Sequence, residues 1–264
     1  MGWNPSCVCA VTGTVLLLAI GCAPQVGGNA PTASLPEVQT KTQADAINRF
    51  SCGRSGKQLS DWTVLQLGAL DPWLDANGVI QASQGIIQEN LIQFAIEFAK
   101  VPHELRSQMV GNGSKVRLIR GQGVSEDPTW PVATQETFDG RSWSTVPGSG
   151  GGPTRVVVNR LYEGHGSINL VLHEYGHSLD SLFKQKGIST SRVWTDLWAA
   201  NPEFAAFIER SCGRYCADHP SEAFAESAAY YFSCDGNRRK IEEKFPLVAR
   251  FLGSLSTLDL RHLN

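Results

Sequence analysis

Residues 173 to 177 read HEYGH. They lie in the stretch SINLVLHEYGHSLDSLF, which we expect to form one helix with Ser167 as its N-cap. Residues four apart on a helix are about 40° apart in projection and one turn apart along the axis. The imidazoles of His173 and His177 can therefore reach one ion, while Glu174 can contact a water on that ion without binding the ion itself. This is the HExxH pattern of zinc enzymes. The alternative is a pair of histidines on an ordinary amphipathic helix.

A catalytic zinc needs a third protein ligand and one open position. The metzincin pattern would require Gly at 180 and His at 183, but the chain has Asp180 and Phe183 there. A glutamate further along is the other option, since Glu222 and Glu226 are four apart on one face of a helix predicted from Pro220 to Phe232. One of them can bind zinc while the other accepts the distal N–H of a ligand histidine. The alternative is a solvated glutamate pair on a surface helix.

The segments HEYGHSLD, from residue 173, and YCADHPSEAFAE, from residue 215, resemble the catalytic domain of anthrax lethal factor and its relatives. These relatives include the secreted clostridial Pro-Pro endopeptidases. The resemblance extends over residues 155 to 233. It implies a zincin-like metalloprotease domain that holds one zinc ion and hydrolyses peptide bonds.

The resemblance also assigns roles to single residues. It implies that the ligands of the zinc ion are His173, His177 and Glu222. Glu174 is the implied general base, and Tyr215 the implied stabiliser of the oxyanion on the substrate. Two further acidic residues are implied behind the ligands as their hydrogen-bond partners, namely Glu226 and Asp180.

Two segments upstream of the HEYGH helix have the pattern of β-strands. Lys115 to Gly121 alternates charged and apolar residues, and Thr154 to Arg160, TRVVVNR, is the second strand. The polar, glycine-rich stretch between them is expected to be a loop. In zincins the strand near the active helix presents an open edge to an extended substrate, and we expect Thr154–Arg160 to do so. The alternative is an ordinary strand inside the sheet.

Most of the remaining chain is expected to be helical. Apolar residues from Ile86 to Phe98 recur at three- and four-residue steps, which places them on one helix face. A short sheet beside a run of helices predicts an α+β fold with a small mixed sheet. We expect one domain over 43–264, with a helical N-terminal lobe at about 43–110 and a catalytic core at about 111–264. Further helices are predicted at 191–200, 202–210, 220–232 and 240–255, the last with a break at Pro246.

The N-terminus has the pattern of an export signal. Val11 to Gly21 is an apolar run of eleven residues, too short to span a bilayer and typical of a signal-peptide core. Cys22 follows, and residues 23–42 form a Pro- and Gly-rich tether. Residues 1–22 thus resemble a bacterial lipoprotein signal with Cys22 as the lipidated residue. An ordinary secretory signal and an uncleaved anchor are the alternatives, and all three place the folded part outside the cytosol.

The cysteines of the remaining chain agree with export. There are four, Cys52, Cys212, Cys216 and Cys234, which allow two disulfides in three possible pairings. A helix between Cys216 and Cys234 would be roughly 18 Å long, too long for a bond between them. We therefore favour the pairs Cys212–Cys216 and Cys52–Cys234. A four-cysteine zinc site is the alternative, although the spacing lacks a C-x2-C pair.

Charge restricts the partners. The formal net charge of the 264-residue chain is −2, without the clustered basic excess of nucleic-acid binders. We expect a monomer that acts on a protein or peptide substrate and reaches a membrane only through an N-terminal lipid anchor. The predicted function is therefore an exported zinc endopeptidase. The alternatives are a zinc-stabilised binding module without catalysis and a structural lipoprotein without metal. No residue identifies the substrate.

Overall fold

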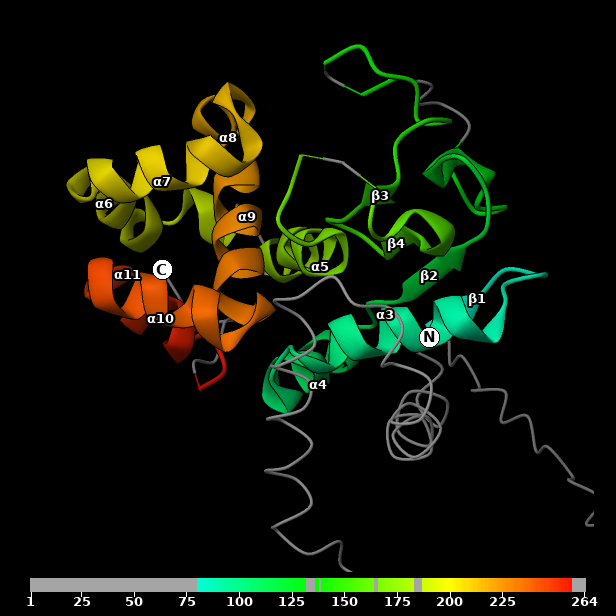
Figure 1. Ribbon diagram of the computed structural model, residues 1–264, viewed down its shortest axis with the longest axis horizontal. Coiled ribbons are helices and arrows are strands. Elements are labelled where there is room, and N and C mark those ends of the chain that lie inside the picture. The colour runs from blue at the N-terminus through cyan, green and yellow to red at the C-terminus, as the bar shows by residue number, and fades with distance from the viewer. Residues whose placement is uncertain (1–79, 132–135, 138, 164–165, 183–186, 258–264) are drawn as a thin grey trace, which may run out of the picture. The chain divides into compact units, whose positions relative to one another are not determined.

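The computed structural model describes residues 80–131, 136–137, 139–163, 166–182 and 187–257 (Figure 1). The predictions for the signal segment, the tether, Cys22, Cys52 and most of the N-terminal lobe lie outside these residues. Within them, a four-stranded sheet and several helices form the α+β arrangement that the sequence predicts. No helix in this described part is long and apolar enough to cross a membrane.

The sheet has the order β1-β2-β4-β3. Its first three strands, β1 (Ile80–Ala82), β2 (Val116–Ile119) and β4 (Thr154–Val157), are parallel, and β3 (Gly148–Ser149) runs antiparallel to β4. The sequence predicted β2 and β4, since their apolar residues fit a buried strand. It missed β1, which lies inside the segment expected to be helical, and it missed β3.

The prediction that Thr154–Arg160 presents an open edge is wrong. β4 pairs with β2 on one side and with β3 on the other, so its backbone is already bonded on both sides. The segment is also shorter than predicted, because Val158–Arg160 forms a 3-10 turn. The open edge near the HEYGH helix belongs to β3 instead. Two residues of a glycine-rich run carry no alternation of side chains by which a strand could be recognised.

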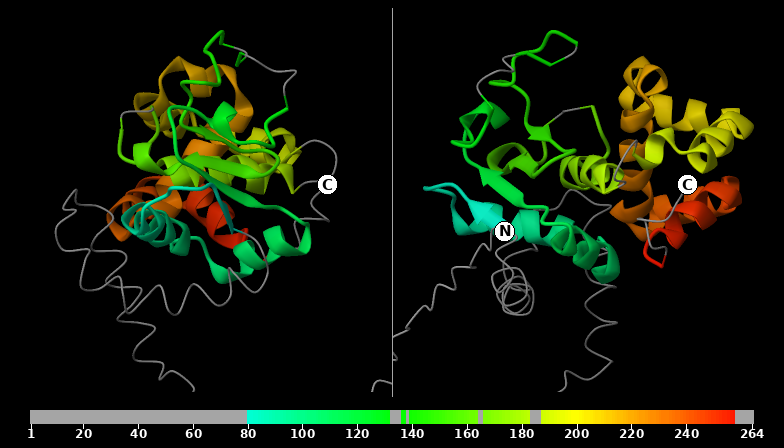
Figure 2. Two further views of the ribbon diagram at one scale, coloured as in Figure 1. Left: turned by 90° about the vertical axis from the view of Figure 1, so that its right-hand side faces the viewer. Right: turned by 180° about the vertical axis from the view of Figure 1, so that it is seen from behind.

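The centre of the fold is the packing of α5 (Leu170–Ser181) against α9 (Pro220–Ser233). In Figures 1 and 2 the sheet lies on one side of α5, and α9 with the C-terminal helices lies on the other. The two helices come so close at Gly176 that a Cβ added there would lie 2.7 Å from the Cα of Ala225. The glycine inside HEYGH is therefore required for the helix contact.

The N-cap of α5 is Asn169, not Ser167 as predicted. The Asn169 side chain accepts a hydrogen bond of 3.1 Å from the backbone N–H of Leu172. Ser167 accepts a bond from the N–H of Asn169 at 3.3 Å, so it supports the turn that precedes the helix. Both residues are good caps, and their two-residue spacing gave the sequence no means of choosing between them.

The remaining helices enclose α5 and α9. They are α3 (Gln88–Ala99), α4 (His103–Gly111), α6 (Arg192–Ala200), α7 (Pro202–Cys212), α8 (Arg214–Asp218), α10 (Asp235–Lys244) and α11 (Pro246–Ser254). α7, α9 and α11 each begin with proline, whose fixed backbone angle suits the first helical position. α8 was not predicted. α10 begins five residues before the predicted start at residue 240. The sequence missed this first part because the helix is polar on most faces and buries only Ile241, so it lacks an apolar pattern.

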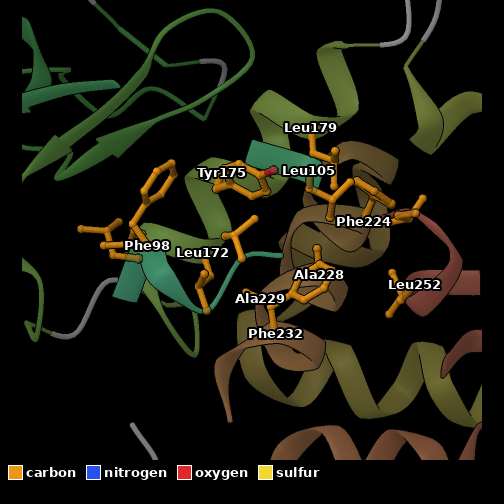
Figure 3. Close-up of a cluster of buried hydrophobic side chains, with 14 of the residues drawn as sticks. Phe98, Leu105, Leu172, Tyr175, Leu179, Phe224, Ala228, Ala229, Phe232 and Leu252 are labelled. Carbon is orange, nitrogen blue, oxygen red and sulfur yellow. The ribbon is translucent and has the colours of Figure 1, made fainter. Parts of the chain in front are cut away.

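One hydrophobic core joins these elements (Figure 3). Tyr175 and Leu179 of α5 are fully buried between α3 and α4 on one side and α9 on the other. The ring of Phe98, on α3, meets that of Tyr175 edge-on at a centroid distance of 5.8 Å. The face of α5 turned away from His173 and His177 is thus anchored by apolar packing, which fixes the direction of the two imidazoles.

Gly176→Ala is expected to destabilise the protein, although alanine ordinarily stabilises a helix interior by about 1 kcal/mol relative to glycine. The new Cβ would press on the backbone of Ala225, so we expect the free energy of unfolding in urea to fall by about 1–3 kcal/mol. Gly111→Ala on α4, where a Cβ would meet nothing within 4 Å, is the matched control and is expected to be neutral or stabilising. Equal effects of the two substitutions would contradict the packing argument.

Candidate metal centre and catalytic cleft

Three side chains from α5 and α9 converge at one point. The Nε2 atoms of His173 and His177 are 3.2 Å apart, and the Glu222 carboxylate lies 3.1 Å from the first and 3.3 Å from the second. A tetrahedral zinc with bonds of about 2.0–2.2 Å requires ligand atoms roughly 3.3–3.5 Å apart. The separations are a few tenths of an ångström shorter than this or at its lower limit, and the two carboxylate distances involve different oxygens, Oε2 toward His173 and Oε1 toward His177. One donor atom from each residue lies within 4.8 Å of the others, close enough to surround one ion. The residues present can hold the ion that the sequence predicts.

The electrostatics of Glu222 agree with a ligand role. Burial alone would raise the pKa of this carboxyl, but hydrogen bonds with His173 and His177 outweigh burial and hold the pKa well below its ordinary value. Glu222 is therefore an anion at neutral pH, as a zinc ligand must be. Of the two glutamates that spacing left open as ligand, the structure turns Glu222 toward the histidine pair.

Glu226 lies on the side of His173 that faces away from His177 and Glu222. It is fully buried, and its Oε2 atom is 3.0 Å from the Nδ1 atom of His173. Its Oε1 atom accepts hydrogen bonds from the backbone N–H of Ile168, at 2.9 Å, and from the hydroxyl of Ser211. A carboxylate at Nδ1 favours the tautomer with the proton on Nδ1, which leaves the Nε2 lone pair facing His177 and Glu222.

Asp180 has a different setting from the one implied. Its carboxylate accepts hydrogen bonds from the backbone N–H of Ser189 at 2.7 Å and from the Ser189 hydroxyl at 2.8 Å. These bonds hold the 3-10 turn Ile188–Thr190 against the end of α5. Burial raises the pKa of Asp180, and the charge of His177 opposes that effect. Asp180 thus supports the segment after the helix, and its interaction with His177 is one of charge alone.

Glu174 lies beside the histidines, under the edge strand. A Cβ added at Gly148 of β3 would stand 2.4 Å from the Glu174 Oε1 atom, and one at Gly150 would meet the backbone oxygen of Glu174 at 2.3 Å. Only glycine allows the strand to lie this close to α5. Sequence reasoning described these glycines as a loop. The feature of the sequence that could have indicated the close approach is the dense run GSGGG at 148–152, just before β4.

A cleft of about 570 Å³ opens above these residues. One wall is β3 with the segment before it, and the other comes from α8 and α9; the lining includes Arg141, Trp143, Tyr215 and Ser221. Burial raises the pKa of Tyr215, and the Glu222 and Asp139 carboxylates raise it further, against the smaller opposing effect of the charge and hydrogen bond of Arg141. The phenol therefore keeps its proton at neutral pH and can donate a hydrogen bond into the cleft.

The comparisons with known proteins agree with this geometry. Residues 81–255 match the family model described as anthrax toxin lethal factor, N- and C-terminal domain. The chain belongs to this family. It is 33% identical over 155 residues to a Pro-Pro endopeptidase of Clostridioides difficile (strain 630), a match that covers 55% of this chain and 66%, just under two thirds, of that protein. It is 27% identical over 168 residues to a Pro-Pro endopeptidase of Paenibacillus alvei, covering 59% of this chain and 72% of the relative.

The fold is shared as well. The solved structure of the Paenibacillus alvei Pro-Pro endopeptidase matches with a TM-score of 0.56 at 22% identity, over 68% of this chain and 98% of that one. The predicted lethal factor-like family and zincin-like α+β fold are thereby confirmed. Both relatives are named Pro-Pro endopeptidases.

The structure also contains the disulfide between Cys212 and Cys216, with a Cα–Cα distance of 5.9 Å. Cys234 is disulfide-bonded too, and Cys52, its predicted partner, lies outside the described residues.

Glu226→Gln is expected to weaken zinc binding, because an amide can present its NH2 group to Nδ1 and so favour the other tautomer of His173. Loss of such a partner typically costs 10–100-fold in metal affinity, and competition with a chromophoric chelator measures it. Glu243→Gln, at an exposed position on α10, is the control and should bind zinc like the wild type. Equal zinc affinity in both variants would contradict the tautomer argument.

Proposed function

We propose that the protein is an exported zinc-dependent endopeptidase. One observation carries the proposal: two imidazole nitrogens and a carboxylate converge within 4.8 Å of one another beside a buried glutamate, inside a cleft. Membership of a family whose relatives are named Pro-Pro endopeptidases supports it. The mixed nitrogen and oxygen donor set suits zinc better than calcium or magnesium, which prefer oxygen ligands alone.

The chemistry is divided among the cleft residues. A zinc ion held by His173, His177 and Glu222 would make a bound water acidic and polarise the substrate carbonyl. Glu174 takes the proton of the attacking water and delivers it to the leaving amine. Burial raises the pKa of Glu174, which makes the carboxylate a stronger base than an exposed one.

Tyr215 acts on the carbonyl oxygen in this proposal. Its protonated phenol lines the cleft on α8, where the Arg141 guanidinium lies 5.9 Å from the ring centroid. A donor aimed at the oxygen that becomes negative in the transition state stabilises that state more than the substrate. The tyrosine therefore raises the rate of the chemical step and contributes little to substrate binding.

We place the substrate along β3. The free side of this strand borders the cleft next to Glu174, whereas β4 is bonded on both sides. An extended peptide that pairs with the edge of a sheet puts its backbone carbonyls at regular positions, one of which can face the zinc ligands. Since the relatives are named Pro-Pro endopeptidases, peptides with a Pro–Pro bond are the first substrates to test.

We also propose that the protein acts outside the cytosol, with Cys22 as the lipid attachment site. The apolar run before Cys22 supports an export signal. The Cys212–Cys216 disulfide supports an oxidising compartment, since such bonds are rare in the cytosol. Metabolic labelling with a fatty-acid analogue tests the lipid, and Cys22→Ser should abolish labelling of the protein.

Glu174→Ala is expected to abolish peptide hydrolysis and to retain zinc, because the glutamate acts on water and does not bind the metal. A positioned general base contributes about 10²–10⁴-fold, so kcat/KM should fall by at least that range. Cleavage of a quenched peptide library, with zinc content by elemental analysis, measures both. Normal turnover in the variant would refute the mechanism. A wild type that binds zinc and cleaves nothing would favour a binding module, and one without metal would favour a structural role.

Tyr215→Phe is expected to lower kcat by about 10²–10³-fold, the usual loss for one oxyanion donor. KM, zinc content and melting temperature should stay close to those of the wild type, because only the hydroxyl is removed. Tyr162→Phe, at a residue that is 61% exposed, is the matched control and should leave kcat unchanged. A larger change in KM than in kcat would assign Tyr215 to substrate binding instead.

A further inference from the structure

The tyrosine of the cleft stands on a very short helix. α8 has five residues and follows Gly213, whose φ of 68° is a left-handed conformation that favours glycine. Helices of this length have little stability of their own, because nucleation costs more than one turn of hydrogen bonds returns. A Cβ at Gly213 would meet nothing within 4 Å, so it is the positive φ, and not a close approach of another segment, that favours glycine here.

The Cys212–Cys216 disulfide spans this turn. Cys212 is the last residue of α7 and lines the cleft, whereas Cys216 lies directly after Tyr215 and is fully buried in the hydrophobic core. The bond therefore ties the backbone next to the tyrosine to the end of α7 and to the core. It restricts the turn in the way that covalent cross-links restrict a flexible loop.

The end of α7 is in turn fixed to the metal centre. Ser211, the neighbour of Cys212, donates its hydroxyl to Glu226, and Glu226 contacts His173 at 3.0 Å. A continuous path thus runs from His173 through Glu226 and Ser211 into the end of α7, and across the disulfide to the residue beside Tyr215. The α7–α8 junction therefore links the position of the Tyr215 phenol to that of the His173 imidazole.

We infer that Cys212 and Cys216 are positioning residues whose disulfide sets the place of the Tyr215 hydroxyl relative to the metal ligands. The inference rests on the proposed peptidase function. Without the bond, α8 is held by non-covalent contacts such as its packing against α7 and α9 and the Arg141 contact of Tyr215. It can then shift about Gly213 while the zinc ligands, which lie on α5 and α9, stay in place. The loss is then confined to the step in which the phenol acts, and substrate and metal binding are preserved.

A double-mutant cycle tests this inference in the full-length protein. Cys212→Ala/Cys216→Ala is expected to lower kcat by about tenfold or more, since misplacement of a catalytic group by 1 Å can cost 10²-fold. KM should change by less than about twofold and zinc content should stay the same, because neither depends on the phenol. In the Tyr215→Phe background the same two alanines should change kcat by less than about twofold, because the group that they displace is already gone.

Two further variants separate positioning from general loss of stability. Cys234→Ala removes the other disulfide and should lower the melting temperature without lowering kcat at temperatures well below it. Gly213→Ala keeps both disulfides but strains the turn at positive φ, so it should lower kcat in the wild-type background and not in the Tyr215→Phe background. This variant also tests the positioning role if the double alanine variant does not fold.

The outcomes are distinct. An equal loss of kcat in the wild-type and Tyr215→Phe backgrounds, or no loss in either, would overturn the positioning role and leave the peptidase function intact. A wild type that cleaves no peptide would overturn the proposed function and this role with it. A loss of kcat confined to the background with an intact Tyr215 hydroxyl would support the inference.

Discussion

The backbone contact between α5 and α9 is the constraint on which the rest of the site depends. HEYGH supplies two imidazoles from one helical turn, but a third donor must come from elsewhere in the chain. It reaches the histidines because residue 176 is glycine, which lets the two helix backbones pack closely. A Cβ added at Gly176 would lie only 2.7 Å from the Cα of Ala225 on α9. A wider separation would move Glu222 out of reach of both histidines, since carboxylate side chains are short. The glycine in the motif is thus as important to the candidate metal centre as the three side chains that converge there.

Buried polar groups then hold in place the side chains that the contact between α5 and α9 brings together. Glu226 is fully removed from water, a position that costs free energy unless its oxygens are satisfied. Its bonds reach Ile168 before α5, Ser211 on α7 and His173 itself. One carboxylate on α9 therefore connects three other segments. On the far side of α5, Phe98 and the neighbouring core residues hold the same helix by apolar packing.

The sequence predicted what depends on local pattern and missed what depends on neighbours. The HEYGH helix, the glutamate helix and two strands follow from the spacing of side chains within single segments. The choice of Glu222 over Glu226 does not, because both lie on one face, and the resemblance to the family had to supply it. Asn169 replaced Ser167 as the cap because two adequate caps stand two residues apart. β3 carries too few side chains to form a pattern, so the sheet edge was assigned to β4. Asp180 bonds to Ser189, a contact that no spacing rule encodes.

The glycine lining of β3 limits how recognition in this cleft can vary. Side chains larger than hydrogen at Gly148 and Gly150 would collide with α5. At these two positions a peptide bound along β3, as proposed, would therefore meet backbone and no side chain. Sequence divergence that retunes selectivity must fall on the facing wall and on the segment before β3, where Arg141, Trp143 and Ser221 lie. Homologues that keep the glycines yet differ at those three positions would bind the peptide backbone in the same way. They would differ in which substrate side chains they prefer.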